Sequence, residues 1–152
     1  MRKTLALDAN VLVLLTVGIA NVDYIARHKR LYPKYRKDHF DCLLDVIKPE
    51  PKLATTTHAL TEASNLLRQC REPMRSEIMV ALAGVIRSND ELTPEAIRAS
   101  EAREFIRLGL TDAAFALLDP DRYIVLSADL DLIVALEIRG FAVVNFDTLL
   151  FD

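Results

Sequence analysis

The chain has 152 residues, of which 51% are hydrophobic and 27% are charged, and its formal net charge is −3. This length and composition predict one domain with a substantial hydrophobic core, and the negative charge excludes an overall field that attracts nucleic acid. No apolar stretch is long and uncharged enough to span a bilayer, and the two cysteines lack Cys-x-x-Cys spacing. Because Asp8 interrupts the apolar run that follows the basic start, no signal peptide is expected. We therefore expect a cytoplasmic protein with reduced thiols and no membrane partner.

The first half of the chain is expected to alternate strands with helices. Strands are predicted at residues 4–7 and 53–55, and helices at residues 9–20, 38–46, 57–69 and 73–87. Residues 21–37 have mixed polarity and contain Pro33, which indicates a loop with some helix. Thr57 is the expected N-cap of its helix, and residues 88–90 are expected to form a turn.

The second half continues the alternation. Helices are predicted at residues 93–109, 112–118 and 129–139, and strands at residues 123–126 and 141–144. Thr93 and Thr111 are expected N-caps, Gly109 an expected C-cap, and the spacing of Glu104 and Arg107 indicates a solvated helix face. Residues 145–152 carry no firm assignment. Strands that alternate with helices imply an α/β fold with a parallel sheet covered on both faces.

Four acids stand in matched settings along this pattern. Asp8 and Asp129 follow apolar strand-like runs directly, whereas Glu62 and Asp112 lie inside apolar helical patterns. Carboxylates in such surroundings are costly unless they are paired or bind a cation, and the carboxyl ends of parallel strands meet at one edge of the sheet. The four acids together therefore predict a cluster that holds Mg²⁺ or Mn²⁺, the ions that suit an all-oxygen site. One or two such ions support phosphodiester hydrolysis.

Each acid, taken alone, also has a structural explanation. Asp8 and Asp129 are placed to cap the helices that follow them. Asp112 lies in the first turn of its helix, where a negative charge interacts favourably with the helix dipole. Glu62 is compatible with a solvated position, although apolar residues surround it. These explanations do not account for the occurrence of all four acids in this order and context.

A basic run interleaved with tyrosines is the one local surface suited to nucleic acid. Its basic residues are Arg27, Lys29, Arg30, Lys34, Arg36 and Lys37. These side chains are suited to phosphate contacts, and Tyr24, Tyr32 and Tyr35 to stacking on unpaired bases. An ordinary solvated loop explains the same residues.

The ordered motifs resemble the PIN domain, and most closely the VapC-like toxin ribonucleases of type II toxin–antitoxin pairs. The motifs are strand-Asp-x-Asn at Asp8, Ala-Leu-Thr-Glu-Ala at Glu62, Gly-Leu-Thr-Asp-Ala-Ala at Asp112 and Val-Leu-Ser-Ala-Asp at Asp129. The resemblance covers residues 5–145 and implies a PIN-like three-layer α/β/α sandwich, formed as a single domain over residues 1–152. It also implies Mg²⁺- or Mn²⁺-dependent cleavage of RNA, with these four acids as metal ligands and catalytic residues.

The same resemblance implies roles for further residues and partners. Asn10 and Ser127 match polar positions that hold the first acid, water or a substrate phosphate. Asp131 would supply a fifth acid, but it lies about 200° around the helix from Asp129 and is therefore at best a supporting acid. Asn145 matches an asparagine with a structural role. The implied partners are an RNA substrate, an antitoxin protein and a second copy of the chain in a homodimer.

The chain departs from the compact toxin pattern at residues 21–37, a basic insert that looks longer than usual. This departure leaves open a catalytically idle PIN-like module that binds RNA or protein. A third alternative is a phosphatase with Asp8 as nucleophile, but such sites need a second acid where this chain has Asn10.

Overall fold

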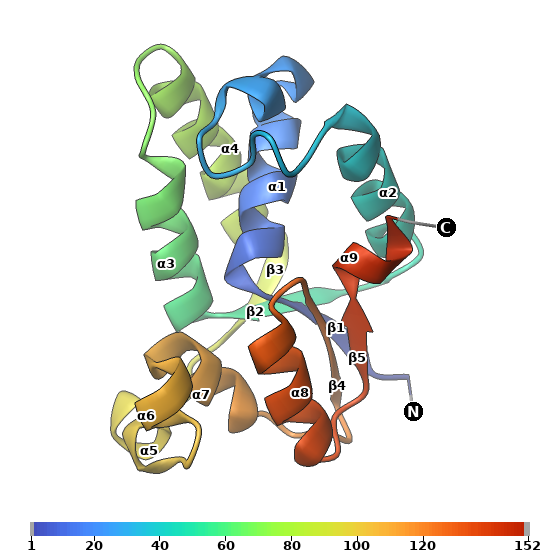
Figure 1. Cartoon of the computed structure of the whole chain (residues 1–152), viewed down its shortest axis with the longest axis vertical. Coiled ribbons are helices and arrows are strands. Elements are labelled where there is room, and N and C mark those ends of the chain that lie inside the picture. The colour runs from blue at the N-terminus through green and yellow to red at the C-terminus, as the bar shows by residue number, and fades with distance from the viewer. Residues whose placement is uncertain (1, 151–152) are drawn as a thin grey trace.

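The computed structural model of the chain describes residues 2–150 and contains a five-stranded parallel sheet with the order β3-β2-β1-β4-β5 (Figure 1). The strands are β1 (Thr4–Leu7), β2 (Leu53–Thr56), β3 (Asn89–Leu92), β4 (Tyr123–Ser127) and β5 (Val143–Asn145). The helices are α1 (Ala9–Ala20), the 3₁₀ helix η1 (Val22–Arg27), α2 (Lys37–Ile47), α3 (Thr57–Leu67), α4 (Met74–Arg87), α5 (Ala96–Glu101), α6 (Phe105–Leu108), α7 (Leu110–Ala116), α8 (Leu130–Ile138) and α9 (Phe146–Leu149).

The helices cover both faces of the sheet. Figure 1 shows α1 to α4 on one side of the strands and α5 to α8 on the other. This arrangement confirms the predicted α/β fold and is consistent with a three-layer sandwich. Along residues 2–150, none of the helices combines the length and the apolar character that crossing a bilayer requires.

The core forms around β1 and α1. Leu5, Ala6 and Leu7 are buried in the central strand, and α1 is apolar over almost its whole length and nearly completely buried. A helix that is apolar on all sides is stable only when other elements surround it. At Gly18, an added Cβ atom would lie 2.1 Å from the ring of Phe40, so the absence of a side chain lets α2 approach α1 closely.

One strand was not predicted, and the expected turn at residues 88–90 is wrong. β3 begins at Asn89 and pairs with β2 in parallel, with Leu53 opposite Asn89 and Thr56 opposite Leu92. The sequence Asn-Asp-Glu-Leu lacks the β-branched and aromatic residues that signal a strand. β3 lies at the edge of the sheet, where its polar side chains reach solvent. Its extended conformation is held by the backbone hydrogen bonds to β2.

The long helix predicted at residues 93–109 is also wrong. The structure has two short helices, α5 and α6, separated by an extended Ala102 (φ −70°, ψ 144°). Glu95, and not Thr93, precedes α5 as its N-cap residue. Glu104 is only 7% exposed and pairs with Arg139, so the solvated pairing of Glu104 with Arg107 does not occur. A tertiary ion pair therefore overrides the local helical pattern.

Several helix ends differ from the predictions by a residue or two. The cap of α3 is Thr56 instead of Thr57, and its hydroxyl accepts from the Ala59 N–H at 3.0 Å. Gly109, with φ +89°, ends α6 as predicted, and it also takes the N-cap position of α7 that was expected of Thr111. Asn145 has the expected structural role, because its side chain caps the unpredicted helix α9.

Candidate active site

Two of the four predicted acids stand side by side at one edge of the sheet. β1 and β4 are neighbouring parallel strands, with Leu7 opposite Leu126, so Asp8 and Asp129 both lie just beyond their carboxyl ends. The strand order reverses direction at this pair: β2 and β3 extend the sheet on one side of β1, and β4 and β5 on the other. In open parallel sheets, ligands bind beyond the carboxyl ends of the strands at this switch point.

Asp8 is a buried carboxylate that two hydrogen bonds hold in place. It is 3% exposed, its Oδ1 atom accepts from the Ala9 N–H at 2.7 Å, and its Oδ2 atom accepts from the Ser127 hydroxyl at 2.8 Å. Burial is the main reason why the pKa of Asp8 rises to about 6, against the opposing effect of these two hydrogen bonds. The charges of Asp129 and Glu62 raise the pKa further.

Ser127 links the two strand-end acids. Its hydroxyl oxygen accepts from the Asp129 N–H at 3.0 Å while the hydroxyl donates to Asp8. Asp129 in turn caps α8, where its Oδ1 atom accepts from the N–H groups of Asp131 and Leu132 at 3.0 and 3.3 Å. The expected capping roles of Asp8 and Asp129 are therefore real, and they coexist with a shared position at the switch point.

Asp112 and Glu62 approach the same edge from helices. Asp112 lies in the first turn of α7, and its pKa rises to about 7 because of burial and the charges of four other acids. These acids, in decreasing order of effect, are Asp8, Asp129, Glu62 and Asp131. Glu62 is exposed on α3, and the Thr111 hydroxyl donates to its Oε1 atom at 3.5 Å. Chain segments far apart in sequence thus bring five carboxylates within electrostatic range of one another.

The carboxylates are gathered, but they are not arranged as ligands of one ion. Among residues 2–150, no group of three or more His, Cys, Asp or Glu side chains is close enough to hold a metal ion together. The chemistry of the donors nevertheless fits a hard cation, because all are oxygens, and because burial together with their mutual repulsion raises the pKa values of Asp8 and Asp112. Ligation would require the exposed Glu62 side chain and the half-buried Asp129 side chain to turn toward Asp8 and Asp112.

The basic insert lies close to this edge. All six of its predicted basic side chains are exposed. Arg30, Lys34, Tyr35 and Asn10 line a small hollow of 170 Å³, and Asn10 lies in the first turn of α1, two residues beyond Asp8. The insert therefore extends from its own loop to the start of the helix that Asp8 caps.

Two of the three tyrosines in the basic insert are buried, which differs from the prediction. Tyr24 and Tyr35 are 7% and 6% exposed and belong to the core, so the prediction that they stack on bases is wrong. Tyr32 is 62% exposed and keeps the position that stacking requires. An alternation of basic and aromatic residues is compatible with both arrangements, because it does not reveal which rings the fold buries.

Sequence reasoning missed the residue that anchors the insert. His28 is fully buried; its Nε2 atom lies 3.1 Å from the Leu67 carbonyl oxygen, and its Nδ1 atom accepts from the Arg30 N–H at 3.2 Å. Burial lowers the pKa of His28, which favours the neutral ring that these two contacts need. Arg30 also donates from Nε to Gln69 at 2.8 Å, so the insert is attached to the end of α3.

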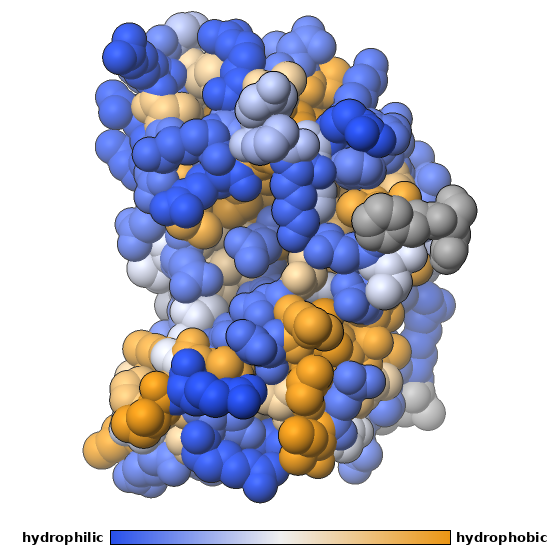
Figure 2. Space-filling view, in the orientation of Figure 1, coloured by the Kyte–Doolittle hydropathy of each residue, from blue (hydrophilic) through white to orange (hydrophobic). Residues whose placement is uncertain are grey.

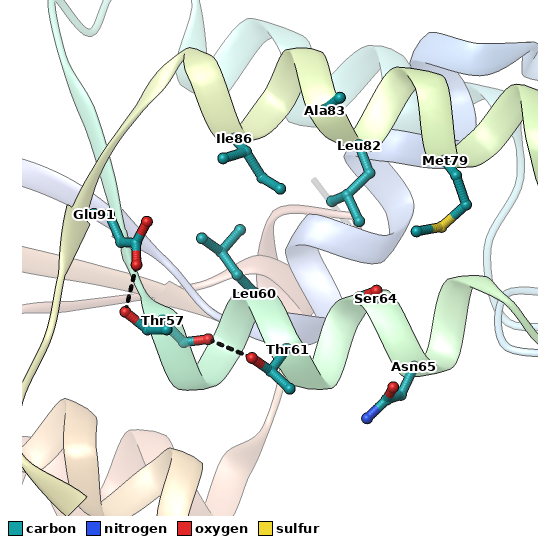
Figure 3. A pocket seen from close by; sticks show the side chains of 10 residues that line it. All are labelled: Thr57, Leu60, Thr61, Ser64, Asn65, Met79, Leu82, Ala83, Ile86 and Glu91. Atoms are coloured by element: carbon teal, nitrogen blue, oxygen red, sulfur yellow. Dashed lines mark hydrogen bonds between the residues drawn. The ribbon is translucent and has the colours of Figure 1, made fainter.

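A larger hollow, of 440 Å³, lies between α3 and α4 and contains none of the four acids (Figure 3). Leu60, Leu82 and Ile86 point into it from the two helices, while the Thr57 hydroxyl at its end donates to Glu91 at 2.6 Å. Its lining offers no cluster of charged groups. This groove therefore lacks the acids on which the candidate site depends.

No protein-family model matches the chain, and no curated protein matches it.

Proposed function

We propose that the chain is a PIN-like, Mg²⁺- or Mn²⁺-dependent ribonuclease. One observation carries the proposal: acids from four separate segments converge at the switch point of a parallel sheet, where burial, and after it the charges of the neighbouring acids, raises the pKa values of Asp8 and Asp112. Folding gains no stability from gathering like charges, so a role in binding a cation is the physical reason for their arrangement. The ordered PIN-like motifs in the sequence support the same function.

Asp8, Glu62, Asp112 and Asp129 would hold the ion. When bound, Mg²⁺ or Mn²⁺ activates water and stabilises the charge that develops on the phosphodiester oxygens. Ser127 keeps the Asp8 carboxylate in one orientation by donating to its Oδ2 atom. Asp8 and Asp129 are held further by backbone N–H groups at the starts of α1 and α8, so the strand ends preorganise both acids.

The basic insert would bind the RNA backbone. Arg30 and Lys34 line the hollow that also contains Asn10, which places positive charge beside the segment that carries Asp8. Lys34 is held by Asp147 at 3.1 Å, and the Arg30 Nε group by Gln69. Side chains held in this way lose less conformational entropy when they bind a phosphate. The exposed ring of Tyr32 is available to stack on an unpaired base.

Cleavage of a mixed pool of labelled RNAs tests the proposal directly. Wild type, Asp8→Asn and the control Asp121→Asn are compared in EDTA, Mg²⁺ and Mn²⁺. Asp121 is an exposed acid that precedes β4, at the opposite end of that strand from Asp129. We expect metal-dependent cleavage by wild type and the control, and a loss of about 100-fold or more in Asp8→Asn. Equal cleavage by all three proteins would contradict the assignment of the site.

A catalytically idle module is the second candidate, and a specific observation favours it. Both oxygens of Asp8 are already engaged by hydrogen bonds, and among the described residues the acids do not form a ligating cluster. Such a protein would bind RNA or a protein partner without cleaving RNA in Mn²⁺. The aspartate-nucleophile phosphatase has less support, because Asn10 is exposed and supplies no second acid. Trapping of a phosphoaspartate on Asp8 would be the result that favours it.

A further inference from the structure

The end of α3 and the basic insert together form a second basic surface, away from the acidic edge. Its cations come from two segments: Lys29 and Arg30 belong to the insert, and Arg68 and Arg71 lie directly after α3. All four side chains are exposed. Within the part of the chain that the structure describes, none of the four forms an ion pair with an acid. We call these four residues the basic platform.

Tertiary contacts hold the two segments of the basic platform together. The Arg30 Nε group donates to the Oε1 atom of Gln69, in the turn that follows α3, at 2.8 Å. The buried ring of His28 lies against the same turn, with its Nε2 atom 3.1 Å from the Leu67 carbonyl oxygen. Folding gains no stability from bringing four cations together, because like charges repel one another. The arrangement therefore indicates an anionic ligand.

The acid nearest in sequence does not neutralise the basic platform. Glu72 follows Arg71 directly, but its carboxylate is engaged at the start of α4. The Ser76 N–H donates to the Glu72 Oε1 atom at 2.7 Å, and the Ser76 hydroxyl donates to Oε2. The Nε atom of Arg75 lies 3.7 Å from the same Oε1 atom. The platform therefore keeps its positive charge in a chain whose net charge is −3.

The surface around the platform is hydrophilic. In Figure 2 the hydrophilic colour predominates in the upper part of the molecule, where Figure 1 places the insert and the end of α3. The hydrophobic colour gathers instead in the lower part, around α5 to α8. A polar surface with unpaired cations suits the phosphates of a nucleic-acid strand, which are contacted mainly by arginine and lysine side chains.

A continuous path joins the basic platform to the acidic edge. The hollow of 170 Å³ is lined by Asn10 at the start of α1, by Leu66 near the end of α3, and by Arg30 of the platform. Arg68 follows Glu62 by six residues, so it lies about 9 Å further along the axis of α3. A strand with one phosphate at the acids would pass Asn10 and the hollow to reach the platform.

We propose that the basic platform is an exosite that binds RNA at a distance from the bond that is cut. This inference rests on the proposed ribonuclease function and names its substrate class: an RNA strand that continues beyond the cleaved bond toward the end of α3. A dinucleotide has a single phosphate and cannot occupy both places. Contacts at the platform bind the substrate and its transition state equally, so they lower KM and leave kcat unchanged.

Binding of labelled oligouridine by Asp8→Asn protein, measured by fluorescence anisotropy at a series of salt concentrations, tests the exosite. Arg68→Gln with Arg71→Gln is compared with a matched control, Arg98→Gln with Arg107→Gln, which removes two exposed arginines from α5 and α6. In the plot of log affinity against log salt, the platform variant should lose a slope of about 1.4, the value for two single-strand phosphate contacts, and the control should lose none. Equal slopes in the two variants, or no binding of oligouridine by the Asp8→Asn parent, overturn the proposal.

A competition experiment separates an RNA ligand from an acidic protein. Polyglutamate carries a dense negative charge but has neither phosphates nor bases. At equal concentrations of charge, we expect it to displace labelled oligouridine at least tenfold less effectively than unlabelled oligouridine does. Equal displacement by the two polymers would assign the platform to an acidic protein partner and overturn the proposal.

Cleavage kinetics separate the exosite from the catalytic site. On an RNA that wild type cleaves in the pool assay, Arg68→Gln with Arg71→Gln should raise KM about tenfold and leave kcat unchanged. A fall in kcat overturns the exosite. If wild type cleaves no RNA with any metal, the proposed ribonuclease function fails, whereas the binding experiment still decides the role of the platform because the Asp8→Asn protein needs no activity.

Discussion

At the scale of single residues, the acidic edge works against the stability of the fold. Asp112 has its pKa raised to about 7, and Asp8 to about 6, so both groups resist ionisation in the folded chain. In the unfolded chain each aspartate ionises near its ordinary pKa of about 3.9. The folded state therefore binds more protons than the unfolded state between these values, and its stability falls as the pH rises through them.

We predict that Asp112→Asn stabilises the metal-free protein. Its neutral side chain avoids both the cost of burying a charge and the repulsion of the neighbouring acids, so the melting temperature in EDTA should exceed that of wild type at pH 8. The difference should shrink as the pH falls toward 4, where the folded wild type keeps the proton on Asp112. Thermal unfolding at a series of pH values measures the effect, with Asp121→Asn as the control that should behave like wild type.

Metal ions should reverse this order if the acids bind a cation. Mn²⁺ at 100 times its dissociation constant would stabilise wild type by about 2.7 kcal/mol, whereas Asp112→Asn would gain less. An Asp112→Asn protein that gains as much from Mn²⁺ as wild type does would remove Asp112 from the set of ligands.

At the scale of elements, one buried ion pair joins two helices that sequence patterns treat separately. Glu104, which precedes α6, accepts from Arg139 at the end of α8 through two bonds, Nε to Oε2 at 2.5 Å and Nη2 to Oε1 at 2.7 Å. The Arg139 guanidinium is the main reason why the pKa of Glu104 falls to about 2. This pairing holds the start of α6 beside the end of α8.

We predict that Glu104→Gln lowers the free energy of unfolding by about 2–4 kcal/mol at pH 7, because Arg139 loses its charged partner. The folded pKa of Glu104 lies below its ordinary value, so the stabilisation is present above about pH 4.5 and is lost as the pH falls toward 2. Urea unfolding at pH 7 and pH 3 measures the difference. Glu101→Gln, at an exposed site in α5, is the control and should leave stability unchanged at both pH values.

At the scale of the whole molecule, a net charge of −3 opposes the approach of RNA while the basic insert attracts it. Binding must therefore depend on a few local cations, and it should weaken steeply as salt rises. Lys34 and Arg30 line a hollow together with Asn10, which lies two residues after Asp8 in the sequence.

This balance predicts a local effect of Lys34→Met on RNA affinity. Measured in the Asp8→Asn background, the plot of log affinity against log salt should lose a slope of about 0.7, the value for one phosphate contact to a single strand. Lys48→Met, at an exposed lysine after α2, is the control and should keep the wild-type slope. If both variants keep that slope, the basic insert is only a solvated loop.

Much of the fold and of the candidate site was predictable because local patterns encode it. The apolar runs before Asp8 and Asp129 mark β1 and β4, and strand polarity alone brings the ends of parallel neighbours to one edge. The apolar setting of Asp112 indicated a partly buried acid, and its side chain is half-buried in the structure. Glu62, in a similar setting, lies exposed, because the helical pattern does not show which face the rest of the chain covers.

The alternation of strands and helices and the order of the acids can be read from the sequence alone, because each depends on neighbouring residues. Which polar and aromatic groups are buried is set by the folded chain, since burial depends on contacts with segments that are distant in the sequence. In the folded chain, the polar edge strand β3 is held by its pairing with β2. Glu104 is buried against Arg139, and the rings of Tyr24 and Tyr35 lie in the core. The basic insert is likewise anchored by the contact between His28 and Leu67 at the end of α3, which are 39 residues apart along the chain. Contacts between residues so far apart leave no periodic signal, so they appear only when the chain has folded.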